Sequence, residues 1–453
     1  MNAIFRAKMV KRLTILISDP LDQSSSLKRF LPIGTLICSA IAIYWPVFFH
    51  HFQTSWDDLW VLQNNYTENG FTPENLWNIL TQFYHGQYAP VNELYYLTLY
   101  WVGGYDSFLF HLWGLFIHIC NILMVYRLIL ILLRRYSKLG TLSAQRIAFF
   151  TAVLFSIHPF LVEAVAWISA SKIILYAFFY LLALHAYLYF LECGKLTFYW
   201  FTITLFVLSF GAKEQAVTLP CCLLLLDYIA GRSLKDKKVW LEKVPLFALS
   251  IIFGYITFLS QAANGQGVLS AAAKYPFYQN LLFASFSLTE YLTKCLIPVK
   301  LSYIYPFPNL PGEPVPLRFW IYPFIIFFSL VGLWNFWKQK WVCFGILFFI
   351  IHIAITINLI STARFAIIAD RYVYLSAIGV FFMVSYFLEL AIIKKNKYLN
   401  FVISAGIFYI ILLSVYSHER VKVWYDSDSL KQEIRNVIKN RKDYHEYEKS
   451  VAQ

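Results

Sequence analysis

Residues 30–58 read FLPIGTLICSAIAIYWPVFFHHFQTSWDD, an apolar run followed by a short polar stretch and two adjacent acids, Asp57 and Asp58. The run from Phe30 to Phe49 has about the length, roughly 20 residues, that a helix needs to cross a bilayer. The acids then open a long loop that contains no Lys or Arg. We therefore predict a membrane-spanning helix and, at the outer edge of the bilayer, a carboxylate pair placed to do chemistry.

The composition is typical of an integral membrane protein. Hydrophobic residues make up 59% of the 453 residues and charged residues only 14%, whereas soluble domains have an apolar share of about 45–50%. Apolar stretches of spanning length recur along the chain, which predicts one all-α polytopic domain without a soluble module of domain size. No cleavable signal peptide is expected, because the basic start leads into a span and not into a small-residue cleavage site.

The formal net charge of +13 does not indicate a nucleic-acid-binding protein. The basic residues gather in short segments between apolar stretches, where they attract lipid headgroups and set orientation. The seven cysteines lie mostly within apolar segments and show no paired spacing, so neither a disulfide framework nor a metal cluster is expected. Membrane lipid is the expected partner, and nucleic acid is not.

Basic residues between the spans set the predicted orientation. None lies between Arg29 and Arg127, whereas a basic cluster at 134–138 follows the second span. Because cytoplasmic loops are enriched in Lys and Arg, residues 1–29 are predicted to be a basic cytoplasmic segment and the Asp57 loop to be outside. Later basic clusters, also expected in the cytoplasm, lie at 232–243, 338–340 and 394–397.

About eleven crossings satisfy this alternation, with the N-terminus cytoplasmic and the C-terminus outside. The stretch 280–298 would break the alternation if it crossed fully, so it is predicted to be re-entrant or to lie on the outer face. The membrane domain, 30–417, then carries outer loops at 51–106 and 263–317, and a charged helical tail follows at 418–453. The predicted crossings lie near 30–49, 107–133, 146–162, 172–191, 197–211, 214–230, 245–262, 318–337, 341–360, 372–393 and 399–417.

Two amphipathic helices are predicted at the outer face. Thr72 can cap a helix that Pro73 opens, and apolar residues then recur at helical spacing, as in helices that lie on a bilayer surface. A second such helix follows the last span, after candidate caps at 426–428. The two apolar faces consist of Leu76, Ile79, Leu80 and Phe83 and of Leu430, Ile434, Val437 and Ile438.

Several charged residues fall in turns that are predicted to open on the same side as the acid pair. Charges near or inside a membrane domain are costly unless they are paired or hydrated, so this gathering predicts a shared polar cavity. For any single member, an ion pair that pins helices together is the alternative. The residues are Glu163, Lys172, Lys213, Glu214, Arg364, Asp370 and Arg371.

An acid pair beside cations at a lipid-facing cavity suits glycosyl transfer. A carboxylate can take the proton of an acceptor hydroxyl as a general base, and cations can stabilise a phosphate leaving group. Both roles fit a polyprenyl-phosphate-linked sugar, whose tail stays in the bilayer. Because paired acids also bind divalent cations, a metal site is the main chemical alternative.

A series of different short motifs follows in order along the predicted membrane domain. They are Trp56-Asp57-Asp58 with Asn64-Asn65, Tyr88-Ala89-Pro90-Val91, Phe110-His111-Leu112 with His118 and Asn121, His158-Pro159, Glu163-Ala164-Val165, Trp167-Ile168-Ser169, Ala212-Lys213-Glu214 and Arg371-Tyr372-Val373-Tyr374-Leu375. In order and spacing they resemble the GT-C glycosyltransferase core of the transmembrane and tetratricopeptide-repeat O-mannosyltransferases and their bacterial relatives. The resemblance covers almost the whole membrane portion and ends with a lead-in helix at 424–440, without the repeats.

The resemblance implies a GT-C-like fold and an inverting hexosyltransferase, with mannose as one candidate sugar. Asp57 is then the base, and Asp58 orients it or helps to bind an acceptor, either a protein Ser or Thr or an envelope glycan or lipid. No metal is obligatory in this scheme. The implied donor-phosphate contacts are Lys213, Arg371, Lys172 and Arg364, and the implied cavity residues are Glu163, His158, Glu214, Tyr88, His111 and Asp370.

Some of these residues have a structural alternative. His158 precedes a proline in an apolar segment, where a packing role is common. His111 and His118 are seven residues apart on one helix face without an evident third ligand, so a structural role is favoured over metal binding.

Two departures from the family pattern affect the prediction. Ala89 and Ser171 stand where the family usually has Arg, so two phosphate or acceptor contacts are lost, or are replaced by Lys172 or Arg364. A catalytically silent scaffold with the same fold is therefore one alternative. A lipid or solute transporter is another, although transporters often show internal repeats and none is evident here.

The expected compartment is a bacterial inner membrane with the site facing the periplasm. The alternative is the endoplasmic reticulum with a dolichol-linked donor. The sequence Asn65-Tyr66-Thr67 would accept an N-glycan close to the site, which disfavours that alternative.

Overall fold

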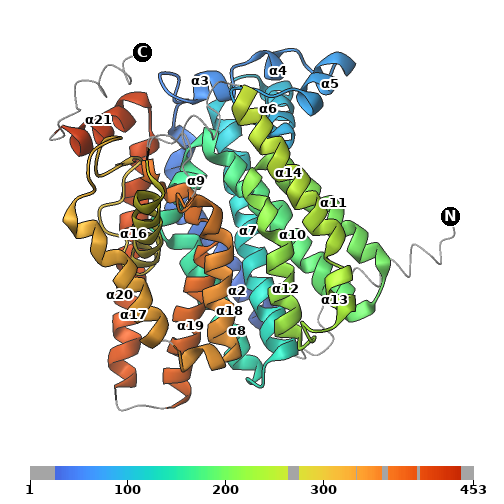
Figure 1. The fold of residues 1–453 in the computed structure, drawn as a ribbon, viewed down its shortest axis with the longest axis vertical. Coiled ribbons are helices and arrows are strands. Elements are labelled where there is room, and N and C mark those ends of the chain that lie inside the picture. The colour runs from blue at the N-terminus through green and yellow to red at the C-terminus, as the bar shows by residue number, and fades with distance from the viewer. Residues whose placement is uncertain (1–25, 264–274, 333, 360–365, 395–397, 440–453) are drawn as a thin grey trace.

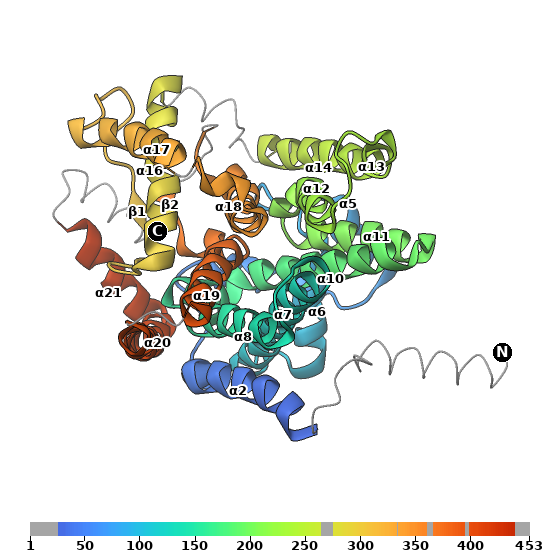
Figure 2. The ribbon, with the colours of Figure 1, turned by 90° about the horizontal axis from the view of Figure 1, so that it is seen from below.

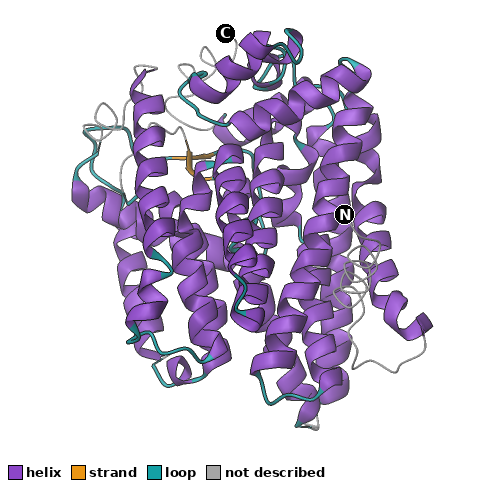
Figure 3. Cartoon of the chain, turned by 90° about the vertical axis from the view of Figure 1, so that its right-hand side faces the viewer, coloured by secondary structure: helices purple, strands orange, loops and turns teal. Residues whose placement is uncertain are grey.

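The computed structural model describes residues 26–263, 275–332, 334–359, 366–394 and 398–439, and nearly all of their regular structure is helical (Figure 3). One helix lies at each of the predicted crossings. These helices are α2 (Ser26–Tyr44), α7 (Ser107–Tyr136), α8 (Thr141–Ile157), α10 (Ser171–Cys193), α11 (Leu196–Ala212), α12 (Leu219–Ala230), α14 (Val244–Ala263), α17 (Ile321–Gly332), α18 (Lys340–Ile353), α19 (Ala377–Ile393) and α20 (Leu399–Val421).

The remaining elements lie between these helices or follow them. The two strands, β1 (Tyr305–Pro306) and β2 (Ala366–Ile368), pair antiparallel. The helical elements are η1 (Trp45–Phe49), α3 (Asp58–Val61), α4 (Asn65–Glu68), α5 (Pro73–Thr81), α6 (Pro90–Gly103), η2 (Pro159–Leu161), α9 (Val162–Ala166), η3 (Ile168–Ala170), η4 (Glu214–Thr218), α13 (Lys237–Leu241), α16 (Phe277–Leu296), η5 (Leu317–Trp320), η6 (Phe336–Lys338), η7 (Ala354–Thr356), η8 (Asp370–Val373), η9 (Lys422–Trp424) and α21 (Ser427–Ile438).

The helix lengths support a multi-pass membrane protein. In the described part of the chain, five helices are long and apolar enough to cross a membrane, and a bent pair, Thr141–Ile157 with Pro159–Ala166, makes a sixth if it is one span. Four further apolar helices have only 10–17 residues. The predicted number of about eleven crossings and their absolute orientation therefore stay predictions.

The core is formed where α7, α8, α10 and α19 pack together. Large aromatic side chains fill it, and Phe155, Tyr180, Tyr187 and Tyr374 are all fully buried. Their tight packing fixes the positions of the helix ends that carry the polar residues described below.

The break between α8 and α9 follows from the His158-Pro159 sequence. A residue before proline is pushed out of the helical conformation, and His158 is extended, with φ −79° and ψ 126°. Its Nδ1 accepts a hydrogen bond from the Phe160 backbone N–H at 3.3 Å. The chain bends by 58° here, and short α9 then places Glu163 at the end of the bundle that also carries the Asp57 loop.

The segment predicted to be re-entrant or interfacial is one unbroken helix, α16. In Figure 2 the helices α7, α12 and α20 are seen nearly end-on, whereas α16 lies lengthwise across the view. An unbroken helix that crosses the direction of the bundle fits the interfacial alternative and not a re-entrant loop.

Both predicted amphipathic helices form. Thr72 Oγ1 accepts from the Asn75 backbone N–H at 3.2 Å and opens α5, and an Asp426 carboxylate oxygen accepts from the Ser429 backbone N–H at 2.8 Å and opens α21. The apolar faces are only partly buried as predicted. Ile79, Leu430, Ile434 and Ile438 are buried, whereas Leu80, Phe83 and Val437 are exposed.

The first outer loop gathers at one end of the bundle. Figure 1 shows α3 to α6 at the top together with α21, whereas the turn between α7 and α8 lies at the bottom. The acid pair and the basic cluster at 134–138 are thus at opposite ends, as the alternation of basic loops requires.

Candidate active site

A cavity of about 240 Å³ lies at the end of the bundle that carries the first outer loop. Asp57 lines it together with four of the seven charged residues that were predicted to share a cavity with the acid pair, and these five come from four separate parts of the chain. These residues are Asp57, Lys172, Lys213, Glu214 and Arg371.

Asp58 is the buried member of the acid pair. Its carboxylate accepts hydrogen bonds from the Gln53 backbone N–H at 2.7 Å and from both the backbone N–H, at 3.2 Å, and the hydroxyl of Ser169. Burial raises the pKa of Asp58 to about 6, against the lowering effect of these hydrogen bonds. Asp58 thereby ties the first outer loop to η3, the turn that leads into α10.

Asp57 has different surroundings. It lines the cavity, and one carboxylate oxygen accepts from the Trp60 indole N–H at 3.2 Å. Within the described residues no other hydrogen bond to this carboxylate is formed. Asp57 is therefore the acid of the pair that is available to a ligand in the cavity.

Arg371 is held by a buried carboxylate and by aromatic rings. Its guanidinium donates to Glu163 and lies 5.0 Å from the ring centre of Tyr372, 5.4 Å from that of Trp167 and 5.9 Å from that of Tyr303. Guanidinium groups stack well on aromatic faces and bind oxyanions in a fixed geometry. Because Arg371 also lines the cavity, it is positioned to meet an anionic group there.

Two lysines complete the cationic wall. Lys213 follows α11 and lies 3.1 Å from a Glu214 carboxylate oxygen, with its ammonium 5.9 Å from the Tyr372 ring centre. Lys172 lies in the first turn of α10 and donates to the Gln87 side-chain oxygen at 2.8 Å. Three cations on one cavity give it the means to bind a phosphate group.

Gln87 belongs to a tight hairpin that sequence reasoning did not detect. Tyr84 and Gln87 exchange backbone hydrogen bonds of 3.0 and 2.9 Å, and both residues between them have positive φ, 45° at His85 and 73° at Gly86. Such φ values are those of a two-residue type I′ turn. The hairpin brings Gln87 and Tyr88 to the cavity, and the Tyr88 hydroxyl donates to the Leu80 carbonyl at 2.8 Å.

Four residues that the resemblance assigns to the cavity do not line it. His158 caps the break between α8 and α9, and its ring lies 4.8 Å from that of Phe381. His111 is buried, with its ring 5.7 Å from that of His50. Both histidines therefore have the structural roles that were their alternatives.

Asp370 is the third of these residues, and it points away from its neighbour Arg371. It accepts from the Tyr305 hydroxyl at 2.6 Å and lies 3.6 Å from an Arg420 guanidinium nitrogen. Burial raises the pKa of Asp370, so the group belongs to a buried ionic cluster and not to the cavity. Glu163 acts on the cavity only through Arg371, and Arg364 lies outside the described residues.

A metal site finds little support in the side chains that are described. No group of three or more His, Cys, Asp or Glu residues in the described part of the chain could hold an ion. Because the Asp58 carboxylate already accepts three hydrogen bonds, the acid pair offers an ion mainly Asp57. A mechanism without an obligatory metal stays a prediction.

The segment after α20 packs against Trp167 and the loop before Asp57, which was not predicted. Trp424 stacks on Trp167, with ring centres 5.2 Å apart, and its carbonyl accepts from the Gln53 side-chain N–H at 3.0 Å. One residue later, the Tyr425 carbonyl accepts from the His51 backbone N–H at 2.9 Å. We call residues 424–427 the C-terminal brace, since they hold the loop before Asp57 against the aromatic rings around Arg371.

The arrangement of the membrane helices has a counterpart among solved structures. The structure of the Archaeoglobus fulgidus oligosaccharyltransferase matches 95% of this chain with a TM-score of 0.50 and 13% sequence identity. The chain spans 60% of the length of that protein. No protein-family model and no curated protein matches the sequence.

At this identity the likeness concerns the fold alone. It supports a GT-C-like membrane fold, as the sequence motifs predict, because the archaeal protein has that fold. It does not show a specific relationship to the O-mannosyltransferases, which stays a resemblance between short motifs.

Proposed function

We propose that the protein is an inverting glycosyltransferase that moves a sugar from a polyprenyl-phosphate-linked donor to an acceptor hydroxyl at the outer membrane face. The observation that carries this proposal is the placing of Asp57 on one cavity with Lys172, Lys213 and Arg371. A fold like that of an oligosaccharyltransferase supports the same reaction class.

The proposed step is a direct displacement. The acceptor oxygen forms a bond to the anomeric carbon of the sugar while the bond from that carbon to the phosphate oxygen breaks. Asp57 takes the proton of the acceptor hydroxyl as general base. The polyprenyl phosphate leaves, and Arg371, Lys213 and Lys172 stabilise the negative charge that develops on it.

Lys172 can also replace the arginine that the family usually has at the position of Ala89. It lines the cavity together with Ala89, the position where the family usually has Arg. A cation from α10 is thus available where the hairpin lacks one, which favours an active enzyme over a silent scaffold. We place the reaction at the periplasmic face of a bacterial inner membrane, with the endoplasmic reticulum as the alternative.

Transfer of label from defined donors tests this proposal. Membranes that contain the native chain, Asp57→Asn or Asp428→Asn would receive polyprenyl-phosphate mannose or glucose labelled in the sugar. Asp428→Asn is the control, because Asp428 is an exposed acid in the first turn of α21. We expect label in a new product with the native chain and the control, and transfer reduced roughly 100-fold or more by Asp57→Asn.

Two results would contradict the proposal. Equal transfer by the native chain and Asp57→Asn would remove Asp57 as the base. Movement of the intact labelled lipid across the membrane, without a new glycosidic bond, would indicate a transporter.

A further inference from the structure

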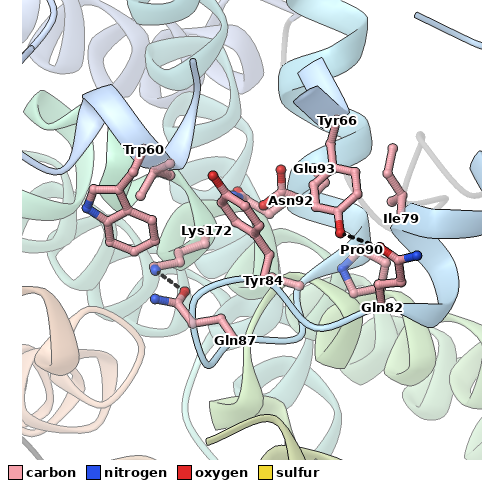
Figure 4. Close-up of a pocket in the computed structure, with 12 residues that line it drawn as sticks. Trp60, Tyr66, Ile79, Gln82, Tyr84, Gln87, Pro90, Asn92, Glu93 and Lys172 are labelled. Carbon is pink, nitrogen blue, oxygen red and sulfur yellow. Dashed lines mark hydrogen bonds between the residues drawn. The ribbon is translucent and has the colours of Figure 1, made fainter. Parts of the chain in front are cut away.

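A second, smaller pocket adjoins the cavity on the side of the first outer loop. Its walls come from α3 to α6 and from the start of α10, and Figure 4 shows Asn92 and Glu93 behind Tyr84, with Lys172 and Trp60 to one side and Tyr66 to the other. We call it the Glu93 pocket. It adjoins the cavity through five residues that line both; these shared residues are Trp60, Val61, Gln87, Ala89 and Lys172.

Two buried oxygen atoms in this pocket lack a hydrogen-bond donor. They are Oε2 of Glu93 and Oδ1 of Asn92, and neither has a partner among the described residues. Buried polar atoms are almost always satisfied in native proteins, and leaving an acceptor unpaired is unfavourable. The pair of acceptors therefore calls for donors that enter from outside the protein.

The cavity and the Glu93 pocket differ in the charged residues that line them. Arg371 and Lys213 line the cavity and not the pocket, whereas Glu93 lines the pocket and not the cavity. Lys172 lines both spaces, so the difference lies in the two further cations, which attract a phosphate to the cavity, and in the carboxyl group of Glu93, which does not attract it to the pocket. The Glu93 pocket thus suits a neutral ligand rich in hydroxyl groups.

The volumes of the pocket and the cavity limit how such a ligand can bind. The free space in the Glu93 pocket is about 20 Å³, which has room for the hydroxyl-bearing edge of a larger group and not for a whole sugar ring. The ring body would occupy the adjoining cavity of about 240 Å³ beside Asp57, with one hydroxyl-bearing edge in the pocket. Trp60 lines both spaces and offers an aromatic wall to the apolar face of the ring, whereas Tyr84 lines the pocket that the edge of the ring enters.

We propose that the Glu93 pocket binds a saccharide acceptor, whose hydroxyl groups donate to Glu93 and Asn92 while another hydroxyl faces Asp57. This inference rests on the proposed function for the word acceptor; the binding of a saccharide does not depend on it. A Ser or Thr side chain presents one hydroxyl, whereas the two oxygens call for neighbouring donors on one rigid group. A saccharide acceptor is therefore favoured over a protein acceptor.

Ligand-observed NMR on the purified full chain in lipid nanodiscs tests the proposal. The probes are methyl α-mannoside, methyl β-glucoside, methyl β-galactoside and a blocked Ala-Thr-Ala peptide. Saturation transfer is measured for the native chain, Glu93→Gln and a matched control, Glu74→Gln, since Glu74 is an exposed acid in the same loop. We expect at least one glycoside to bind the native chain and the control, and to bind Glu93→Gln roughly tenfold more weakly.

A second variant guards against misfolding. Tyr84→Leu removes one aromatic wall and leaves both buried oxygens in place, so weakened glycoside binding by this variant would also support the proposal. Binding of the peptide alone, dependent on Glu93, would overturn it. So would equal glycoside binding by the native chain, Glu93→Gln and Tyr84→Leu, because the pocket would then hold water only.

Asp57→Asn separates this inference from the proposed function. It should abolish sugar transfer, while the glycoside binding of this variant should still be weakened by adding Glu93→Gln, because Asp57 lines the cavity and Glu93 lines the pocket. If native protein binds glycosides through Glu93 but transfers no sugar, the proposed function fails and the saccharide pocket stands.

Discussion

At the scale of single residues, the two neighbouring acids differ because the carboxylate of only one of them is buried and hydrogen-bonded to several groups of the protein. Asp58 accepts three hydrogen bonds from Gln53 and Ser169, whereas Asp57 accepts one from Trp60 and faces the cavity. The sequence motif could indicate an acid pair but not this division. The partner Ser169 is more than a hundred residues away in the chain, and no local pattern reports it.

The division predicts opposite effects of two similar substitutions. Asp58→Asn puts an amide N–H₂ where a backbone N–H or a hydroxyl needs an acceptor, so we expect it to lower the free energy of unfolding by about 1–3 kcal/mol. Asp57→Asn should change it by less than about 0.5 kcal/mol. Thermal unfolding of both variants in the same lipid nanodiscs checks this, and a larger loss for Asp57→Asn would contradict it.

The Arg371 and Glu163 pair allows stability to be separated from function. Arg371→Gln leaves a buried carboxylate without its cation, which costs roughly 3–5 kcal/mol. Adding Glu163→Gln removes that unpaired charge, so the double variant should regain most of the lost stability but no transfer activity. Recovery of transfer by the double variant would show that Arg371 acts on structure and not on the phosphate.

The carboxyl group of Glu93 predicts a pH effect. Burial raises its pKa from 4.5 to about 7, opposed by Asn64 and Lys172. A pKa above the ordinary value means that the folded state favours the protonated form, so this contribution to stability is full below pH 4.5 and is lost as the pH rises through about 7.

Glu93→Gln isolates that contribution. The native protein should lose stability relative to this variant between pH 4.5 and 7, by up to about 3 kcal/mol at about 1.4 kcal/mol per pKa unit. Unfolding temperatures of both proteins across that pH range give the measurement. Parallel pH profiles would show that Glu93 titrates normally.

At the scale of elements, the helix caps could be predicted from neighbouring residues, whereas contacts between segments far apart in the sequence could not. The caps Thr72 and Asp426 act within three residues, and both helices begin where these caps predict. Val437 lies beside the buried face of α21 but is exposed. Helical spacing predicts which side of the helix is apolar, but not how many of the apolar residues on that side are buried. The C-terminal brace was not foreseen, since its partners Gln53 and Trp167 lie far away in the sequence.

The C-terminal brace makes a direct prediction. Trp424→Ala removes a fully buried ring that packs against Trp167 and Tyr303, so the free energy of unfolding should fall by about 3–5 kcal/mol. Activity measured well below the unfolding temperature should fall too, because those two rings flank Arg371. Val437→Ala is the matched control on α21, and an equal effect of both substitutions would contradict the role of the brace.

At the scale of the whole molecule, composition and hydropathy predicted the class and the places of the helices. The end of the bundle at which the charged turns meet was also predicted, from the alternation of basic loops. The sequence could not show that Tyr303, from the second large outer loop, reaches Arg371, nor decide between the re-entrant and the interfacial alternative for α16. Both depend on how the helices pack and not on their individual patterns.

Sidedness can be tested by labelling single cysteines. In a chain whose native cysteines are replaced by Ser, Glu74→Cys should react with a membrane-impermeant maleimide in intact cells, because the first outer loop is predicted to be outside. Lys235→Cys, in a basic cluster, should react only after permeabilisation. The reverse pattern would invert the predicted topology and place the cavity on the cytoplasmic face.

The central claim is that Asp57 serves as the base for sugar transfer. The most direct measurement is mass spectrometry of membrane and envelope glycoconjugates from cells that carry the native chain, a deletion or Asp57→Asn at equal protein level. We expect the deletion and Asp57→Asn to lose the same glycan, whose mass then identifies the sugar and the acceptor. If the Asp57→Asn chain fully rescued the deletion strain, so that the glycan was made at the native level, Asp57 would not be the base.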